Sequence, residues 1–489
     1  MVASSESRSA QVRARLDHPV IDADGHHLEM GPVFLDYLKE VGGTTMVERY
    51  LAAGLNSGEL WMRQGRHDPL APRQGWWSFP AKNTLDRATA HLPGLFYERL
   101  DELGIDYSVV YPTVSRTLAG LPDPEMRIAC CRAYNRYAAE VYRPFADRLT
   151  PAAVVPILTP EMGIQEAEYA VKETGLKVIM IAGGVSLPRR PDPRLLAKHP
   201  DAASEAYYLD LLALDSEYDY DPFWAKCVEL GFAVAEHSNG MGMDDRSSMS
   251  NYMYNHIGHF AAAGEVLAKS LLMGGVTRRF PELKIALLEG GAAHGCRLYA
   301  DLIARWEKRG APNLPHLDPA KLDRELIQQL FEEYGGEMVE GKLDQLERIL
   351  NLRGAPDDVE DNFAPMEIER AEDFRDRFIP HFYFGCEADD PTTAWAFDDR
   401  VNPFNAKLRA IMSTDLGHWD VPDMRSAVAE AHEPVDHGLM SADDFRDFAF
   451  TNQVTLYAST NADFFQGTAV ESAAVELLAA DVLTANKGG

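Results

Sequence analysis

The sequence predicts a (β/α)8 TIM barrel, an α/β fold in which eight parallel strands alternate with helices. Short runs rich in Val, Ile and Phe recur along the chain. Longer stretches with helical spacing of apolar residues separate them, and polar residues follow most runs directly. This alternation is typical of βα units around a parallel sheet. The runs that qualify as strands lie at residues 19–23, 106–111, 151–158, 176–182, 231–237, 283–290, 381–387 and 408–415.

Three stretches between these runs have the features of helices. Residues 126–145 are amphipathic at helical spacing. Residues 160–175 and 221–231 each end on a glycine, the residue that most often closes a helix. The helices therefore fall where a barrel needs them, between one strand and the next.

Two long stretches, 40–95 and 310–375, do not fit the repeat. The second is rich in Asp, Glu, Leu and Arg, which predicts helices with a solvated acidic face. Because neither stretch has a strand pattern of its own, we expect both to be insertions in one barrel domain. That domain spans residues 1–489 and ends in a tail over about 466–489.

The charge and the cysteines restrict the class of protein. The formal net charge is −29 at pH 7, so the chain repels phosphate backbones and anionic lipid, and we expect no nucleic-acid or membrane partner. The five cysteines form no CxxC pair, which favours a reducing compartment. We find no apolar run suited to a signal sequence or a membrane span. We therefore expect a cytoplasmic protein.

Potential metal ligands stand at the carboxyl ends of the predicted strands, where enzymes with this fold place their chemistry. Carboxylate and imidazole groups are common ligands of divalent ions such as zinc. If the first strand continues to its end, residues 22, 24 and 26 share one face, and Asp24 and His26 point together into the barrel mouth. The residues at the strand ends are Asp24, His26, His237, Glu289, Glu387 and Asp415.

Each of these residues also has an ordinary explanation. Asp24-Gly25-His26 suits a polar turn, a histidine such as His237 commonly forms structural hydrogen bonds, and Asp415 suits a helix N-cap. The four residues nevertheless fall on strands 1, 5 and 8 of one barrel. The set therefore predicts a metal site more strongly than any one of its members does.

Four segments resemble the amidohydrolase-2, or ACMSD-like, branch of the amidohydrolase superfamily. The similarity runs from about residue 18 to about residue 465 and is interrupted by the two insertions. The order of the motifs is specific, whereas any one motif alone is not. The segments are VIDADGHHLE (20–29), AYNRYAAEVYRPFADRLTPAAVVP (133–156), RFPELKIALLEGGAAHG (279–295) and STDLGHWD (413–420).

The resemblance implies a barrel with one catalytic divalent metal ion, with zinc as the first choice and manganese as the second. The family's strand-1 ligand pair corresponds to Asp24 and His26, its strand-5 histidine to His237, and its strand-8 aspartate to Asp415. The sequence departs from the pattern at strand 6, where several members have a histidine. Here Glu289 stands in that place and His294 follows five residues later. Either could take the histidine's catalytic role, or Glu289 could orient a ligand imidazole.

Two further residues could contact substrate. His418 lies three residues after Asp415, as in many relatives, and could hydrogen-bond the ligands or the substrate. Arg116 follows the second strand and could bind a substrate carboxylate, although an arginine there is more often on the surface. His256 and His259 follow the fifth strand, either in a loop over the barrel mouth or packed in a helix.

The leading interpretation is metal-dependent hydrolysis of a small cyclic or aromatic molecule by a metal-activated water. Asp415 would then accept a proton from the water, and His294 or Glu289 would stabilise the oxygen that gains charge. The alternative is non-oxidative decarboxylation of an aromatic or enolic acid at the same metal site. A barrel that binds metal or ligand without turnover is a third interpretation, which the complete ligand set argues against.

Two expectations concern segments outside the repeat. Tryptophan-rich residues 61–79 could form a lid over a flat substrate, or could pack the insertion onto the barrel or onto a partner subunit. Apolar residues in 440–480 and in the insertions offer surface for self-association. We therefore expect a homo-oligomer, either a dimer or a tetramer, that acts on a small-molecule substrate.

Overall fold

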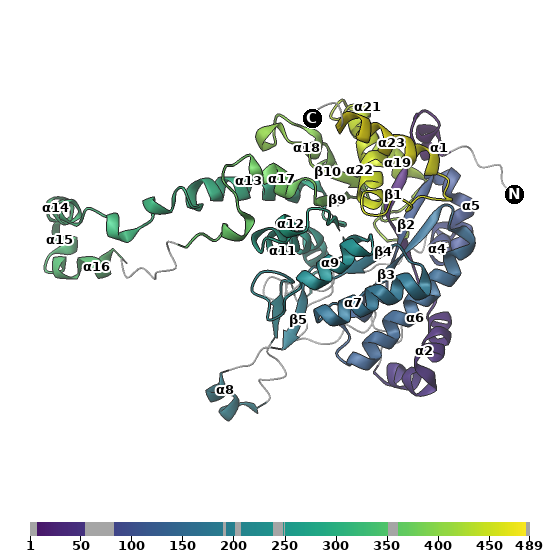
Figure 1. Ribbon diagram of the computed structural model, residues 1–489, viewed down its shortest axis with the longest axis horizontal. Helices are drawn as coiled ribbons and strands as arrows, with labels where there is room; N and C mark the ends of the chain where they lie inside the picture. The colour runs from purple at the N-terminus through teal and green to yellow at the C-terminus, as the bar shows by residue number, and fades with distance from the viewer. Residues whose placement is uncertain are drawn as a thin grey trace.

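The computed structural model of the protein describes residues 7–53, 83–188, 192–200, 207–237, 248, 250–350 and 360–485. Eight parallel strands form one sheet in the order β1-β2-β3-β4-β7-β8-β9-β10, which curls into a nearly closed barrel (Figure 1). All eight predicted strands are confirmed, and the fold is a (β/α)8 barrel. The strands are β1 (Ile21–His27), β2 (Tyr107–Pro112), β3 (Leu149–Val154), β4 (Val178–Ile181), β7 (Ala233–Glu236), β8 (Ile285–Leu287), β9 (Phe382–Cys386) and β10 (Arg409–Met412).

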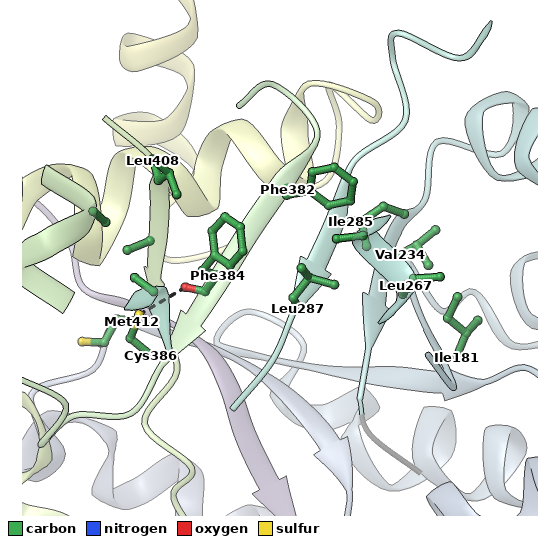
Figure 2. Close-up of a cluster of buried hydrophobic side chains, with 14 of the residues drawn as sticks. Ile181, Val234, Leu267, Ile285, Leu287, Phe382, Phe384, Cys386, Leu408 and Met412 are labelled. Carbon is green, nitrogen blue, oxygen red and sulfur yellow. Dashed lines mark hydrogen bonds between the residues drawn. The ribbon is translucent and has the colours of Figure 1, made fainter. Parts of the chain in front are cut away.

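The strand side chains alternate between two buried layers, as the two-residue period of a strand requires. Ala23, Tyr107 and Ala152 belong to the layer that fills the barrel. Figure 2 shows part of the other layer, in which Val234 and Ile285 lie near Leu267 of the surrounding helices. Because both faces of the sheet are buried, the strands read as nearly continuous apolar runs in the sequence.

Helices surround the barrel (Figure 1). The predicted helices at 126–145, 160–175 and 221–231 are confirmed, and Gly175 and Gly231 follow the last two with positive φ values of 72° and 69°. The helices that cover or flank the barrel are α1 (Arg8–Arg13), α2 (Gly31–Ala52), α4 (Thr84–His91), α5 (Pro93–Leu103), η1 (Ser115–Gly120), α6 (Pro124–Tyr142), α7 (Pro160–Tyr169), α9 (Asp221–Glu229), α10 (Tyr252–His256), α11 (His259–Met273), α12 (Val276–Arg279), α13 (Ala292–Arg309), α17 (Asp373–Phe378), α18 (Thr393–Phe397), α19 (Ala427–Ala431), α20 (Glu433–Asp436), α21 (Ala442–Arg446), α22 (Asn452–Ala458) and α23 (Glu471–Ala485).

Other elements extend from the barrel. The strands β5 (Val185–Pro188) and β6 (Tyr207–Asp210) form an antiparallel hairpin between β4 and β7, with the short helix α8 (Pro193–Lys198) in its connection. This hairpin was not predicted from the sequence, because its strands, VSLP and YYLD, contain polar residues and a proline instead of an unbroken apolar run. No helix among the residues that the structure describes is long and apolar enough to cross a membrane.

The two long insertions differ in how much of them the structure describes. In 310–375, the helices α14 (Arg324–Tyr334), α15 (Gly336–Val339) and α16 (Leu346–Ile349) lie well away from the barrel (Figure 1). The helix α14 contains no buried residue, as its predicted solvated face requires. In 40–95, the described parts belong to α2, α4 and α5, and the predicted tryptophan-rich lid at 61–79 lies outside the described residues.

His381, immediately before β9, makes the stability of the fold depend on pH. The side chain is 2% exposed, and its Nδ1 donates to the Leu283 carbonyl at 2.9 Å. Burial, assisted by the charges of Lys284 and Arg377, lowers the pKa of His381 from 6.5 to about 4. Between these two values the unfolded chain binds a proton that the folded chain does not. The contribution to stability is therefore lost as the pH falls from 6.5 toward 4.

We expect His381→Asn to reduce this sensitivity to acid. Asparagine keeps a donor near the position of Nδ1 but takes up no proton. Between pH 7.5 and pH 5, the variant should lose about 2 kcal/mol less unfolding free energy than the wild type. Urea unfolding at the two pH values measures this difference. The exposed His316→Asn serves as the control, and equal losses in His381→Asn and wild type would contradict the prediction.

Candidate metal centre

Backbone hydrogen bonds join the first and last strands of the barrel at their carboxyl ends. The Asp415 N–H donates to the Asp24 carbonyl at 3.0 Å, and the His26 N–H donates to the Leu416 carbonyl at 2.8 Å. These bonds bring together residues from nearly opposite ends of the chain. Asp24 and His26 therefore lie directly beside Asp415.

Asp22 supports this junction from outside the ligand group, which we define as Asp24, His26, His237, Glu289 and Asp415. Its Oδ1 accepts from the Thr414 N–H at 2.9 Å, and its Oδ2 accepts from the Ser108 hydroxyl at 2.9 Å. The pairing of β1 with β2 shifts in register between Asp22 and Gly25. Asp24 and His26 lie beyond this irregularity and point together as expected. Asp22 lies before it and instead bonds to Ser108 of β2 and to Thr414 after β10.

Ligand atoms of four other buried side chains surround the Nε2 atom of His26. It is 3.3 Å from Asp24 Oδ1, 3.2 Å from Glu289 Oε1, 3.1 Å from Asp415 Oδ1 and 3.2 Å from His237 Nε2. His237 Nε2 is also 3.0 Å from Glu289 Oε1. The structure thus brings together the four residues that the sequence selected as ligands and adds Glu289 to them.

Glu289 and Asp415 both have left-handed backbone conformations, with φ values of 58° and 54°. Such a conformation costs a residue other than glycine about 1 kcal/mol or more and is concentrated at functional sites. The two residues stand where β8 and β10 give way to loops. The turn at each position aims its carboxylate at the group around His26. This conformation explains why Glu289 reaches the ligands although its strand ends two residues earlier.

The charges in this group favour a cation. Burial opposes protonation of His26, yet Asp24 and Glu289 beside it raise its pKa to about 9. Burial would raise the pKa of Glu289, but the adjacent His237 and His26 hold that pKa well below its usual value. Burial raises the pKa of Asp415 far above the ordinary value, and Asp420 and Glu289 add to the effect. The carboxylates therefore create a strongly negative potential around the imidazoles.

The residues fit a divalent metal ion. Among the described residues, both carboxylate oxygens of Asp24, Oε1 of Glu289 and Oδ1 of Asp415 are buried and accept no hydrogen bond. Ligand atoms about 2 Å from one ion lie about 3 Å from their neighbours, as these atoms do. Asp24, His26, His237 and Glu289 satisfy the geometry of a metal site as one set, and His26, Glu289, Asp415 and His418 as another. Imidazole and carboxylate together suit zinc or manganese.

His418 belongs to the edge of this group. Its Nδ1 is 2.5 Å from Asp415 Oδ1, its Nε2 is 3.1 Å from the Thr113 hydroxyl, and its ring stacks on His26 at 3.7 Å between centroids. These contacts orient Asp415, or make His418 a ligand itself. The predicted contact of His418 with substrate stays a prediction. Thr113 was missed by the sequence analysis, because a threonine after a strand carries no distinguishing signal.

Arg116 is buried beside the ligand group, with only 1% of its surface exposed, although a surface position was the commoner expectation. Its Nη1 lies 3.5 Å from His237 Nδ1. Burial lowers the pKa of Arg116 to about 10, and the negative charges of Glu289 and Asp415 partly oppose this effect. Glu29 fixes the 3-10 helix η1 that carries Arg116, because its carboxylate accepts the N–H groups of Val114 and Ser115 at 3.0 and 2.8 Å.

His294 belongs to neither of the two candidate metal sets. Its Nδ1 is 3.1 Å from the Gly290 carbonyl, and its ring packs edge-on against Phe384. A Cβ atom at Gly264 of α11 would meet His294 Nε2 at 3.3 Å and Glu236 Oε2 at 3.7 Å. Of the two residues that could replace the family's strand-6 histidine, Glu289 therefore reaches the ligands, and His294 faces α11. The catalytic role predicted for either residue stays a prediction.

Further ionisable side chains lie near the barrel mouth. Burial, reinforced by Asp420 and Glu289, raises the pKa of Glu387 to about 9. His256 Nε2 is 3.6 Å from Asp420 Oδ2, and its ring packs edge-on against Trp419. His256 is the last residue of α10, so it occupies the short helix after strand 5 and not an irregular loop.

A nearly closed barrel with two imidazoles and three carboxylates at its carboxyl end fits the class of metal-dependent TIM-barrel enzymes. A family model described as "Amidohydrolase" matches residues 62–339, which is more than half of the chain. The protein therefore belongs to this amidohydrolase family, as its motifs indicated.

Individual relatives are distant. The chain is 24% identical, over 221 residues, to 2-amino-3-carboxymuconate-6-semialdehyde decarboxylase of Dictyostelium discoideum; the match covers 43% of this chain and 54% of that protein. It thus spans about half the length of this relative. An amidohydrolase of Mycobacterium avium subsp. paratuberculosis has a similar fold, with 17% identity, a TM-score of 0.52, and coverage of 90% and 100% of the two chains. A 2,6-dihydroxybenzoate decarboxylase overlaps less well, with 15% identity, a TM-score of 0.47, and coverage of 90% and 99%.

We expect Glu289→Gln to weaken metal binding and His294→Ala to leave it intact. Glutamine removes a negative ligand oxygen from the group around His26, whereas His294 faces α11. Zinc or manganese affinity should fall at least about tenfold in the first variant, as measured by equilibrium dialysis and elemental analysis of the bound metal. Wild-type metal affinity in Glu289→Gln, or an equal loss of affinity in His294→Ala, would contradict the assignment of Glu289 as a metal ligand. Circular dichroism checks that both variants are folded.

Proposed function

We propose that the protein is a metal-dependent decarboxylase of a small aromatic or enolic carboxylic acid. The observation that carries this proposal is the buried guanidinium of Arg116 beside the ligand group. A guanidinium and a divalent ion together suit a carboxylate, which can bind both. The curated relative from Dictyostelium discoideum is itself a decarboxylase. Both observations favour the second of the two reactions considered from the sequence over hydrolysis, which was placed first.

Asp24, His26, His237, Glu289 and Asp415 would hold one zinc or manganese ion. The bound ion would polarise the substrate carboxylate or a neighbouring oxygen and stabilise the negative charge that develops during the reaction. Arg116 would hold the carboxylate oxygens on the side of His237. The barrel strands fix these groups before substrate arrives, so little reorganisation is needed.

The reaction needs one proton at the carbon that loses its carboxylate. His418, whose Nδ1 lies 2.5 Å from Asp415 Oδ1, would hold this proton at the edge of the ligand group. We propose that this proton is transferred to the ring or enol carbon. The carbon–carbon bond to the carboxylate then breaks, its electron pair stays on the protonated fragment, and CO2 leaves. A proton from water restores the Asp415–His418 pair.

Isotope labelling separates decarboxylation from hydrolysis. The metal-loaded protein is incubated in D2O with a panel of hydroxybenzoates and enolic acids, and the products are analysed by mass spectrometry and NMR. Decarboxylation releases CO2 and leaves one solvent deuteron on the carbon that carried the carboxylate. Hydrolysis in H2(18)O would instead place labelled oxygen in the product, and CO2-free turnover of that kind would refute the proposal.

We expect Arg116→Met to reduce kcat/KM for the acid substrate by about 100-fold or more, because the buried carboxylate loses its cationic partner. Arg116→Lys should recover part of this loss, since the charge returns without the planar pair of donors. Steady-state assays of CO2 release measure both effects. Arg400→Met, at an exposed position, is the control. Unchanged activity in Arg116→Met, with metal content also unchanged, would remove Arg116 from the proposed mechanism.

A further inference from the structure

A cavity of about 240 Å³ opens between η1 and the carboxyl ends of β3 and β4. Val155, Ile157, Leu158 and Val185 supply the apolar part of its wall, and polar atoms supply nearly as much of the accessible lining. Small residues of η1 (Ala119 and Gly120) and of the segment after β4 (Ala182 and Gly184) line the rest of the cavity. Its polar side chains are neutral hydroxyls, and no ionisable side chain belongs to the described lining.

This cavity lies on the Arg116 side of the ligand group. Thr117, one of its hydroxyl residues, directly follows Arg116 in η1. Ala182, another lining residue, directly follows Ile181, whose carbonyl accepts the His237 N–H at 3.1 Å. The cavity is thus formed by immediate chain neighbours of the residues that surround His237. This adjacency along the chain is the basis for relating the cavity to Arg116.

The composition of the cavity determines which substituent it accepts. A charged group placed among Val155, Ile157 and Leu158 would lose part of its hydration and would gain no partner of opposite charge from the described lining, which disfavours its binding. An apolar cavity of about 150 Å³ can hold benzene, so 240 Å³ leaves room for a ring with one small substituent. The hydroxyls of Thr117 and Ser186 can bond a neutral oxygen.

We propose that this cavity is a specificity pocket for the uncharged end of the substrate. The substrate would be a monocarboxylic acid with its carboxylate at Arg116 and a flat, neutral, mainly apolar end between η1 and β5. Acids with a second carboxylate at that end would be rejected. This inference rests on the proposed decarboxylase function for the position of the carboxylate. The experiment tests the specificity pocket separately from the decarboxylase reaction, because binding and turnover are measured independently.

The test compares 4-ethylbenzoate with terephthalate, which differ mainly in whether the far substituent is neutral or charged. Binding of each acid to the zinc- or manganese-loaded protein is measured by calorimetry. The wild type should bind 4-ethylbenzoate at least about tenfold more tightly. Ser186→Lys places a cation at the exposed rim of the pocket and should reduce this ratio by about tenfold. Leu158→Lys, in the half-buried wall, is a second variant with the same expectation, and Leu195→Lys on α8 is the matched control.

The outcomes distinguish the specificity pocket from the reaction. Tighter binding of terephthalate by the wild type would overturn the pocket proposal, even if CO2 release from other acids supported the decarboxylase. An unchanged ratio in folded Ser186→Lys and Leu158→Lys would overturn it as well. If the predicted binding ratio and its reduction in the lysine variants are found but no acid of the panel releases CO2, the pocket stands and the proposed reaction fails.

Discussion

The hydrogen bonds that close the barrel between β10 and β1 are the constraint on which the rest of the site depends. Asp24 and His26 enter the ligand group from the start of the chain and Asp415 from near its end. The backbone bonds that join these segments also set the distance between their side chains. An open barrel would leave these N–H groups buried without partners, at a cost in free energy. Closure therefore stabilises the fold and assembles the candidate metal centre at once.

The buried carboxylates are of two kinds, which differ in whether they accept hydrogen bonds. Asp22 and Glu29 accept backbone N–H groups, and each fixes a segment that carries a site residue. Asp24 and the inner oxygens of Glu289 and Asp415 accept no hydrogen bond among the described residues. Carboxylates buried in this way need a cation, and the left-handed turns at Glu289 and Asp415 hold them together at a cost that the surrounding barrel offsets.

In the proposed function, the charged end and the uncharged end of the substrate would bind to different parts of the protein. The ligand group and Arg116 form a charged end on strands and a 3-10 helix that many hydrogen bonds hold in place. The cavity beside them is built from apolar side chains and from β5, part of a hairpin added to the barrel. In a barrel enzyme the strand ends supply the reaction and the loops supply specificity. The hairpin allows one charged end to be combined with a neutral pocket.

The sequence by itself determined the eight strands and four of the five clustered candidate ligands. The strands are buried on both faces and therefore appear as apolar runs, and Asp24, His26, His237 and Asp415 stand where such runs end. Tertiary structure decided the rest. The left-handed turn of Glu289, the burial of Arg116 and the direction of His294 depend on contacts between segments far apart in the chain. A local pattern records which residues end a strand, but only the closed barrel fixes which of them meet.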